Sequence, residues 1–208
     1  MKTSALLPLI RIVDDDPKVL ASEAFLVTMA GFQTITYENA QSFLENYDSV
    51  RPGCVLLDIR MPGMSGLQLQ DEMVKREIDL PIIFLTGHGD IDMAVKALQT
   101  GATDFLVKPP APDRLKLSLQ KAVDKNIEDR KRREEKEHHL ELFEKLTPSE
   151  QSVVLKIAHG EMNKVIAFNL GVSEQAVKNW RSSIFQKLDC KNAIELNSFL
   201  RIVGMWKD

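Results

Sequence analysis

The sequence predicts an α/β fold, a five-stranded doubly wound parallel sheet, followed by a smaller all-helical domain. From Leu9 to Lys108, short apolar runs alternate with amphipathic stretches, which is the pattern of parallel strands joined by crossover helices. A strongly charged stretch without glycine or proline then leads to a helix start at Thr147. A length of 208 residues suits two compact domains joined by a linker.

Five apolar runs are expected to form the strands, and four amphipathic stretches are expected to form helices. The predicted strands are Leu9–Val13, Gln33–Tyr37, Cys54–Asp58, Ile82–Thr86 and Asp104–Lys108. The predicted helices span residues 17–30, 40–46, 66–77 and 91–100. Gly31 and Gly101 follow two of these helices, where a glycine commonly ends a helix. Ligands are expected beyond the carboxyl ends of the strands in such a sheet.

The charged stretch and the region after it define the predicted domain boundaries. We assign residues 1–120 to the α/β domain, 121–145 to a charged helical linker and 146–208 to the helical domain. Thr147 can cap a helix that starts with proline, and Glu150 completes a capping box. Further helices are predicted over residues 148–158, 163–169, 174–187 and 193–203.

Composition and charge argue against a membrane protein and leave nucleic-acid binding open. No apolar run approaches the length of a transmembrane helix, and the N-terminal residues lack the cleavage site of a signal peptide. We therefore expect a cytoplasmic protein with no membrane partner. The net charge is −5 over residues 1–120, zero over 121–146 and +2 over 147–208. The acidic front half suits cation binding, and the mildly basic back half permits DNA binding.

Acidic side chains follow two of the predicted strands. Asp14, Asp15 and Asp16 come directly after the first strand, and Asp58 ends the third. Clustered carboxylates repel one another, but they become favourable around a hard divalent cation such as Mg²⁺. A carboxylate beside such a cation can accept a phosphoryl group, because the metal neutralises the charge that builds up during transfer.

Two other strand ends carry groups that bind phosphoryl oxygens. Thr86 offers a hydroxyl after the fourth strand, and Lys108 offers an ammonium after the fifth. Each feature alone has an ordinary explanation: the aspartates as a solvated turn, the threonine as a strand-end cap and the lysine as a surface charge. Their joint placement at the ends of four strands favours a phosphorylation site.

These segments resemble a known family. IVDDD, LLDIRMPGMSGL, FLTGHGD and DFLVKP resemble the receiver domain of two-component response regulators, in particular the FixJ-like group, over about residues 8–120. The resemblance implies a CheY-like (flavodoxin-like) fold in which Asp58 accepts a phosphoryl group from a sensor histidine kinase. It also implies that Asp14, Asp15, Asp58 and the backbone carbonyl of Arg60 position Mg²⁺ as the cofactor.

The same resemblance assigns residues that respond to phosphorylation. Thr86 and Lys108 would contact the phosphoryl oxygens, and Phe105 matches the family's switch aromatic, which turns inward as the threonine moves. On sequence grounds Phe105 is equally well an ordinary core phenylalanine. The Lys108–Pro109 bond resembles a family feature that is often cis and would aim the ammonium at the site. Pro110 departs from the apolar or aromatic residue of relatives, which leaves the packing of the next helix open.

The helical domain contains the pattern of a helix-turn-helix, a short helix, a glycine turn and a second amphipathic helix. Val177, Ile184 and Leu188 of the second helix can face a core. Its polar residues are Gln175, Lys178, Asn179, Arg181 and Ser182. Amide and guanidinium groups suit base edges, while ammonium and hydroxyl groups suit phosphates. Spacing alone fits a solvated helix in a small bundle just as well.

Residues 146–203 are similar to the LuxR-type DNA-binding domain. The resemblance implies that residues 174–187 are the recognition helix and that the helix from Ala193 mediates dimerisation. The candidate DNA contacts are Lys164, Gln175, Lys178, Asn179, Arg181 and Ser182. Ala176 and Trp180 depart from the commoner threonine and histidine, which leaves the DNA sequence preference open, and we expect Trp180 to be partly buried.

The two resemblances together predict a transcription regulator of a phosphorelay rather than an enzyme. Phosphorylation of Asp58 is expected to shift a receiver equilibrium and to favour a homodimer through the face near residues 91–100 and the fifth strand. Two DNA-binding domains would then dock on promoter half-sites about one helical turn apart. RNA polymerase is a further candidate partner.

Two alternatives stay open. A phosphatase of the haloacid dehalogenase type also uses an aspartyl-phosphate and Mg²⁺, but its nucleophile lies in a DxD motif, whereas Asp58 is followed by Ile59 and Arg60. The other alternative is a phosphorylated receiver whose output domain binds protein or RNA rather than DNA. Salt-dependent binding to duplex DNA would distinguish these functions.

Overall fold

The computed structural model describes residues 6–87 and 101–206 of the chain. The chain divides into two compact units, Met1–Arg130 and Lys131–Asp208. The helix predicted over residues 91–100, the end of the FLTGHGD segment and most of the predicted dimer face lie outside the described residues. In the parts of the chain that the structure describes, no helix combines the length and the apolar character that crossing a membrane requires.

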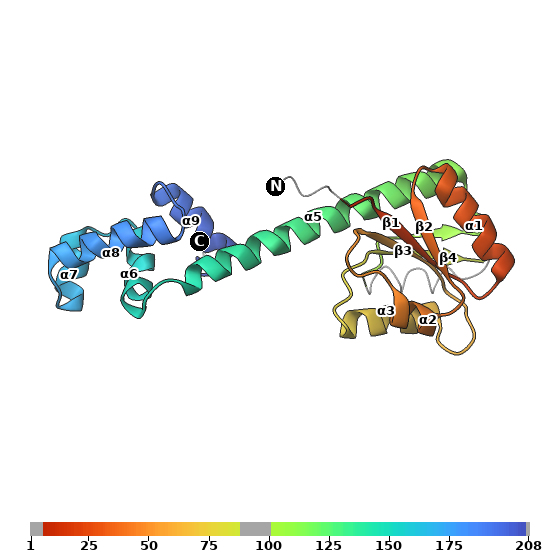
Figure 1. The fold of residues 1–208 in the computed structure, drawn as a ribbon, viewed down its shortest axis with the longest axis horizontal. Coiled ribbons are helices and arrows are strands. Elements are labelled where there is room, and N and C mark those ends of the chain that lie inside the picture. Colours follow the sequence, from red (N-terminus) through yellow and green to blue (C-terminus); the bar gives the residue numbers. More distant parts are fainter. Residues whose placement is uncertain (1–5, 88–100, 207–208) are drawn as a thin grey trace. The chain divides into compact units, whose positions relative to one another are not determined.

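A parallel sheet organises the first unit (Figure 1). Within the described residues its strands are β1 (Leu9–Val13), β2 (Gln33–Tyr37), β3 (Gly53–Asp58), β4 (Ile82–Thr86) and β5 (Asp104–Val107). The order across the sheet is β2-β1-β3-β4-β5, and each neighbouring pair is parallel. The predicted five-stranded sheet is confirmed, although β3 begins one residue earlier and β5 ends one residue earlier than expected.

Alternate residues of the strands face two separate cores. Cys54 and Leu56 of β3 pack with α1 (Pro17–Met29) and α5 (Pro112–Glu144). Val55 and Leu57 pack instead with α2 (Ala40–Asn46) and α3 (Gly66–Lys75), which lie together on one side of the sheet in Figure 1. Because both faces of the sheet are covered, β1, β3 and β4 are buried along their whole length, whereas the edge strand β2 is largely exposed.

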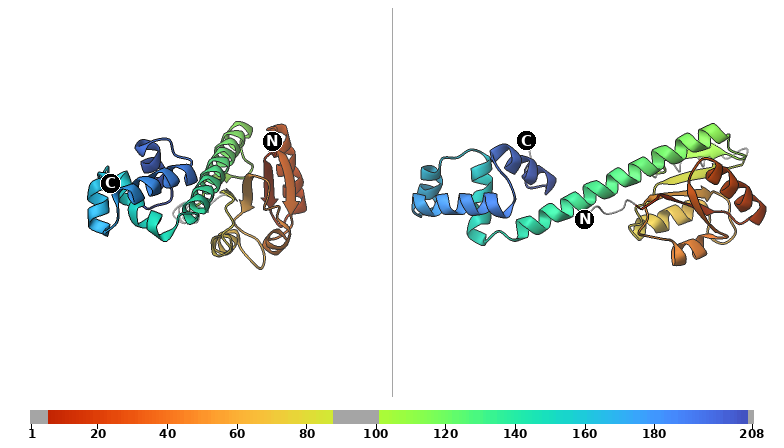
Figure 2. Two further views of the ribbon diagram at one scale, coloured as in Figure 1. Left: turned by 60° about the vertical axis from the view of Figure 1, so that its left-hand side comes forward. Right: turned by 45° about the horizontal axis from the view of Figure 1, so that its top comes forward.

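The helix after β5 is longer than the helix expected to close an α/β domain. Both views in Figure 2 show α5 as one uninterrupted helix, which runs from Pro112 to Glu144. The expected linker is therefore helical. Leu119 packs in a core of the first unit, and Phe143 packs against the core of the second. The two compact units divide at Arg130, inside this helix, so the boundaries predicted after residues 120 and 145 stay predictions.

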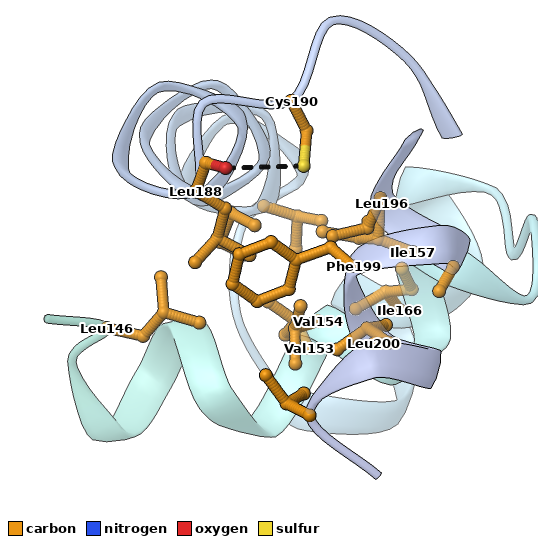
Figure 3. Packing of buried hydrophobic residues seen from close by; sticks show 14 of the residues in the cluster. Leu146, Val153, Val154, Ile157, Ile166, Leu188, Cys190, Leu196, Phe199 and Leu200 are labelled. Atoms are coloured by element: carbon orange, nitrogen blue, oxygen red, sulfur yellow. Dashed lines mark hydrogen bonds between the residues drawn. The ribbon is translucent and has the colours of Figure 1, made fainter. Parts of the chain in front are cut away.

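The second unit is a small helical bundle. Its remaining described helices are α6 (Pro148–Ala158), α7 (Asn163–Leu170), α8 (Glu174–Lys187) and α9 (Ala193–Ile202). They surround an apolar core in which Val154, Ile157, Leu196 and Phe199 lie close together (Figure 3). The four predicted helices are found, with ends shifted by at most one residue, because apolar residues at helical spacing must all reach this core.

Polar side chains cap α6, as the sequence predicts, and α8. The Thr147 N–H donates to Glu150 Oε2 at 2.6 Å, and the Glu150 N–H donates to Thr147 Oγ1 at 3.3 Å, which completes the capping box of α6. Ser173 caps α8 by accepting from the Ala176 N–H at 3.1 Å. Gly171 between α7 and α8 has a φ of 65°, a left-handed conformation that glycine adopts without strain.

Candidate functional site

Polar side chains gather at the carboxyl edge of the sheet. Asp58 closes β3, and Thr86 closes the neighbouring strand β4. Asp14 directly follows β1, and Lys108 directly follows β5. Because the strands are parallel and in register, their carboxyl ends meet at one edge, as expected for the ligand-binding side of such a sheet.

Lys108 joins the two acidic strand ends. Its ammonium donates to Asp14 Oδ2 and to Asp58 Oδ1. The backbone N–H of Lys108 donates to the carbonyl of Thr86 at 2.8 Å, and the Lys108–Pro109 peptide bond is cis, as the resemblance implies. Since one ammonium contacts both carboxylates, Asp14 and Asp58 face each other across it.

Both carboxylates are fixed by the backbone as well as by Lys108. Asp14 Oδ1 accepts from the Asp16 N–H at 2.9 Å, and Asp58 Oδ2 accepts from the Arg60 N–H at 2.7 Å. Asp14 is 2% exposed and Asp58 is 8% exposed. Each carboxylate thus uses one oxygen to fix its orientation and presents the other oxygen to the shared cation.

The backbone after Asp58 depends on a glycine. The Gly66 N–H donates to the carbonyl of Ile59 at 3.0 Å, where α3 begins. A Cβ atom at position 66 would lie 2.2 Å from the carbonyl oxygen of Asp58. That distance is far shorter than van der Waals contact, so a larger residue would push α3 away from the end of β3. Gly66, the second glycine of the LLDIRMPGMSGL segment, therefore lets α3 approach the site closely.

Burial and charge shift two pKa values at this edge. Burial raises the pKa of Asp58, and hydrogen bonds from Lys108 offset part of that rise. Burial also opposes the charged form of Lys108, but the hydrogen bonds that its ammonium donates to Asp14 and Asp58 outweigh burial, so the pKa of Lys108 lies above its usual value. Two buried carboxylates share one ammonium, which leaves an excess of negative charge that suits a further cation.

Glu23 is a buried acidic residue that the sequence analysis does not single out. It lies in α1 and is 3% exposed, and its Oε1 is 3.9 Å from Lys108 Nζ. Burial raises the pKa of Glu23 to about 8, although Lys108 acts in the opposite direction. A signal was present in the sequence, because Glu23 falls three residues after Leu20 and four before Val27, on the apolar face of the helix.

The side chains of Thr86 and Asp15 are placed differently from those of Asp14 and Asp58. The hydroxyl of Thr86, which is 3% exposed, donates to the Gly87 carbonyl at 3.1 Å. Asp15 is exposed to solvent. Over residues 6–87 and 101–206, no three histidine, cysteine or acidic side chains are grouped closely enough to hold a metal ion. The roles of Thr86 and Asp15 toward bound groups stay predictions.

Phe105 and Pro110 flank the site on β5 and in the loop after it. Phe105 is half-buried and packs against the core that α2 and α3 form with the sheet. That packing fits a core phenylalanine, and its role as a switch residue stays a prediction. Pro110 is buried just before α5 begins, so the loop packs against the unit at this position.

The second candidate site is the surface of α8. Val177, Ile184 and Leu188 face the core, as the spacing predicts, and they are at most 2% exposed. The other face presents exposed polar residues, which are Gln175, Lys178, Asn179 and Ser182. Gln175 Nε2 donates to Asn179 Oδ1 at 3.0 Å, so these two amides are already aligned on the helix surface. Lys178 Nζ lies 3.3 Å from Glu174 Oε1 on the same helix.

Arg181 and Trp180 lie at the border of this surface. Arg181 is half-buried, its guanidinium contacts Asn163 Oδ1 at 3.4 Å, and it lies 5.8 Å from the centre of the Phe185 ring. Trp180 is partly buried against the core, as predicted. Lys164, on α7, is exposed. Packing therefore holds Arg181 in place, whereas the side chains of Lys164 and Lys178 are exposed.

Comparison with known proteins identifies the family of both units. Residues 10–120 match the response regulator receiver domain, and residues 144–200 match the bacterial regulatory proteins of the luxR family. This chain is a response regulator. Its receiver domain carries the acidic edge around Asp58, and its LuxR-type domain carries α8.

Individual relatives of this response regulator span nearly the whole chain. Nodulation protein W of Bradyrhizobium diazoefficiens is 36% identical over 197 residues, which cover 93% of this chain and 86% of the relative. The transcriptional regulatory protein FixJ of the same species is 32% identical and covers 96% of this chain and 97% of the relative. The solved structure of the response regulator StyR is 38% identical with a TM-score of 0.85, over 94% of this chain and 98% of that one. The FixJ-like resemblance is confirmed.

Proposed function

We propose that this response regulator accepts a phosphoryl group on Asp58 from a sensor histidine kinase and then binds promoter DNA as a homodimer to regulate transcription. The observation that supports it best is the bridge from Asp14 through Lys108 to Asp58. It combines a buried acceptor carboxylate, a second carboxylate and a cation at the edge of the sheet where ligands bind.

The acidic edge is suited to Mg²⁺. Magnesium commonly takes one or two carboxylates and keeps several waters, and Asp14 and Asp58 supply two carboxylates that share a single ammonium. The proposed ligands are Asp14, Asp58 and the backbone carbonyl of Arg60, with Asp15 beside them. A cation bound there would neutralise charge on the phosphoryl group during transfer.

The protein side chains divide the chemistry among them. An Asp58 oxygen forms the bond to phosphorus while the bond between phosphorus and the histidine nitrogen of the kinase breaks. The Arg60 N–H donates to Asp58 Oδ2 at 2.7 Å and keeps the acceptor carboxylate oriented. Lys108 and the hydroxyl of Thr86 then bind the phosphoryl oxygens, as the family resemblance implies. Lys108 is within reach because its backbone is hydrogen-bonded to the carbonyl of Thr86.

Replacing the acceptor tests this chemistry. Asp58→Asn should abolish labelling by acetyl phosphate in the presence of Mg²⁺, because the amide is a poor nucleophile for phosphorus. Labelling is followed by intact-protein mass spectrometry, and Asp71→Asn, which changes an exposed carboxylate of α3, should label like the wild type. Continued labelling of the Asp58→Asn chain would refute the assignment of the acceptor.

The exposed face of α8 supports DNA as the target of the second unit. Lys178, Asn179 and Ser182 offer an ammonium, an amide and a hydroxyl on one helix, which suit phosphates and base edges. Lys164 adds a positive charge on the preceding helix. Because Lys178 is paired only with Glu174 of its own helix among the ion pairs of the described residues, it can exchange that weak contact for a phosphate.

The salt dependence of duplex binding tests this interface. Lys178→Ala should weaken binding to promoter duplex, and it should reduce the slope of log affinity against log salt by about 1, because one phosphate contact is lost. Lys131→Ala, on the solvated part of α5, is the matched control, and binding is measured by fluorescence anisotropy. Absence of duplex binding, together with binding to RNA or to a protein, would favour the alternative output function.

The proposed function also includes a second copy of this chain and RNA polymerase as partners. A homodimer on phosphorylation would place two α8 helices on two half-sites of the promoter. The receiver face expected to mediate it falls largely on residues 91–100, which the structure does not describe. A regulator that binds promoters works in the cytoplasm, where RNA polymerase is a further predicted partner.

A further inference from the structure

Glu23 is a buried acidic side chain with unsatisfied polar atoms. It is 3% exposed, and within residues 6–87 and 101–206 neither of its carboxylate oxygens has a hydrogen-bond partner. Burying a carboxyl group without a hydrogen bond costs free energy, and an aliphatic residue between Leu20 and Val27 would avoid that cost. The position of Glu23 therefore needs an explanation other than packing.

The nearest charged group is the ammonium of Lys108. Its Nζ lies 3.9 Å from Glu23 Oε1, which is within ion-pair range but too long for a hydrogen bond. A lysine ammonium carries three N–H donors, and Lys108 uses one on Asp14 and one on Asp58. Three acidic side chains thus surround one ammonium, and this ammonium donates hydrogen bonds to two of them.

The surroundings leave space for Lys108 to move toward Glu23. A hollow of about 350 Å³ lies between α1 and the segment Lys108–Pro110, and both Glu23 and Lys108 line it. The rest of its lining from α1 includes Val19, Ser22 and Leu26. A shift of the ammonium by about 1 Å would bring it to hydrogen-bond distance from Glu23.

Lys108 and a bound cation need the same oxygens. Asp14 Oδ1 and Asp58 Oδ2 are already taken by backbone N–H groups, so a metal ion would be offered Asp14 Oδ2 and Asp58 Oδ1, which now accept from Lys108. Two positive charges cannot share that position without strong repulsion. Lys108 must then leave both carboxylates, although its half-buried side chain stays beside them.

We propose that Glu23 receives the Lys108 ammonium when Asp14 and Asp58 bind Mg²⁺, and so acts as a positioning residue for this lysine. This inference rests on the metal site of the proposed function. With Glu23 as its partner, Lys108 keeps a compensating negative charge and stays within reach of Asp58. The raised pKa of Glu23 agrees with a carboxyl group that has no bonded partner while Lys108 is held elsewhere.

Titration of the full chain with Mg²⁺ alone tests the proposal, with amide NMR shifts at the end of β1 and β3 as the readout. Glu23→Gln and Glu23→Leu should each raise the Kd for Mg²⁺ by about tenfold, as expected for loss of a hydrogen bond between charged groups. Glu128→Gln, which changes an exposed carboxylate on α5, should leave the Kd unchanged. Wild-type affinity in both Glu23 variants would overturn the proposal.

The same substitution in a Lys108 variant shows whether Glu23 acts through Lys108. In Lys108→Met chains, Glu23→Gln should have no further effect on the Kd, because the side chain that Glu23 positions is gone. Equal weakening with and without Lys108 would mean that Glu23 attracts the metal through space, which would overturn its role as a positioning residue.

Asp14→Asn separates this proposal from the proposed function. Loss of Mg²⁺ binding in Asp14→Asn, with unchanged affinity in the Glu23 variants, would overturn the role of Glu23 and leave the metal site intact. Undiminished binding in Asp14→Asn would overturn both. Thermal unfolding without Mg²⁺ is the folding control, and Glu23→Leu should unfold at no lower temperature than the wild type. A lower unfolding temperature in both Glu23 variants would assign the effect to misfolding and overturn the proposal.

Discussion

Glu150 makes the stability of the helical unit depend on pH. Its carboxylate completes the cap of α6 and accepts from Lys187 Nζ at 2.7 Å, although it is 3% exposed. Burial would raise the pKa of Glu150, but hydrogen bonds from Lys187, Ser183 and Thr147 outweigh burial and lower it to about 2. A carboxyl group with a lowered pKa stabilises the fold when it is ionised in both states.

The stability of the helical unit should therefore depend on pH through Glu150. The contribution of Glu150 should be fully present above a pH of about 4.5 and should be lost as the pH falls toward 2, with a total of about 2 to 3 kcal/mol. Glu150→Gln should lower the free energy of unfolding at pH 7, and the difference from wild type should shrink at pH 3. Urea unfolding followed by tryptophan fluorescence measures both. An equal difference at the two pH values would contradict the prediction.

Individual residues were predictable where their place in a strand or helix decides their neighbours. Asp14, Asp58 and Lys108 could be brought together because parallel strands end at one edge of the sheet. The orientation of Asp15 could not be predicted, because a residue after a strand can turn to either side. Arg11 was also hidden, since it lies fully buried inside an apolar run and donates to the carbonyls of Leu9 and Arg51.

At the scale of elements, the sequence predicts which helices and strands exist better than it predicts the residues at which they end. Strands bounded by turn residues were placed to within one residue, and the signal is strongest for β1, β3 and β4, which are buried on both faces. The end predicted for α3 was two residues too late. The structure ends it at Lys75, and Glu77 takes a φ of 55°, which a helix cannot contain. That turn leaves no mark in the hydrophobic pattern.

Among the helices, the length of α5 was the hardest to predict. Its apolar stripe fades near Arg130, so the hydrophobic pattern does not show where the helix ends. The structure shows two polar anchors on the same helix: Asn126 donates to the Asp79 carbonyl at 2.8 Å, and Arg130 donates to the Val50 carbonyl at 2.8 Å. Asn126 also accepts from the Gly53 N–H at 3.0 Å. Such contacts between distant segments replace apolar packing and cannot be read from periodicity.

At the scale of the whole molecule, the chain is two compact units with separate cores. Each core is closed by residues of its own unit, and both tryptophans, Trp180 and Trp206, lie in the helical unit. The residues of the proposed phosphorylation site, around Asp58, all belong to the first unit. Damage to one core should therefore leave the other unit folded and active, because stability is carried by contacts within each unit.

Cavity-forming substitutions in the two cores test that independence. Ile157→Ala, at a fully buried position of α6, should lower the unfolding free energy of the helical unit by about 2 to 5 kcal/mol, as measured by tryptophan fluorescence in urea. Phosphoryl labelling of Asp58 should be unchanged at urea concentrations where that unit has unfolded. Leu119→Ala, at a fully buried position facing the sheet, should do the reverse: labelling should be lost at lower urea, while the tryptophan transition stays in place. If either substitution shifted both transitions together, the units would unfold as one cooperative body, and α5 would carry stabilising contacts from one unit to the other.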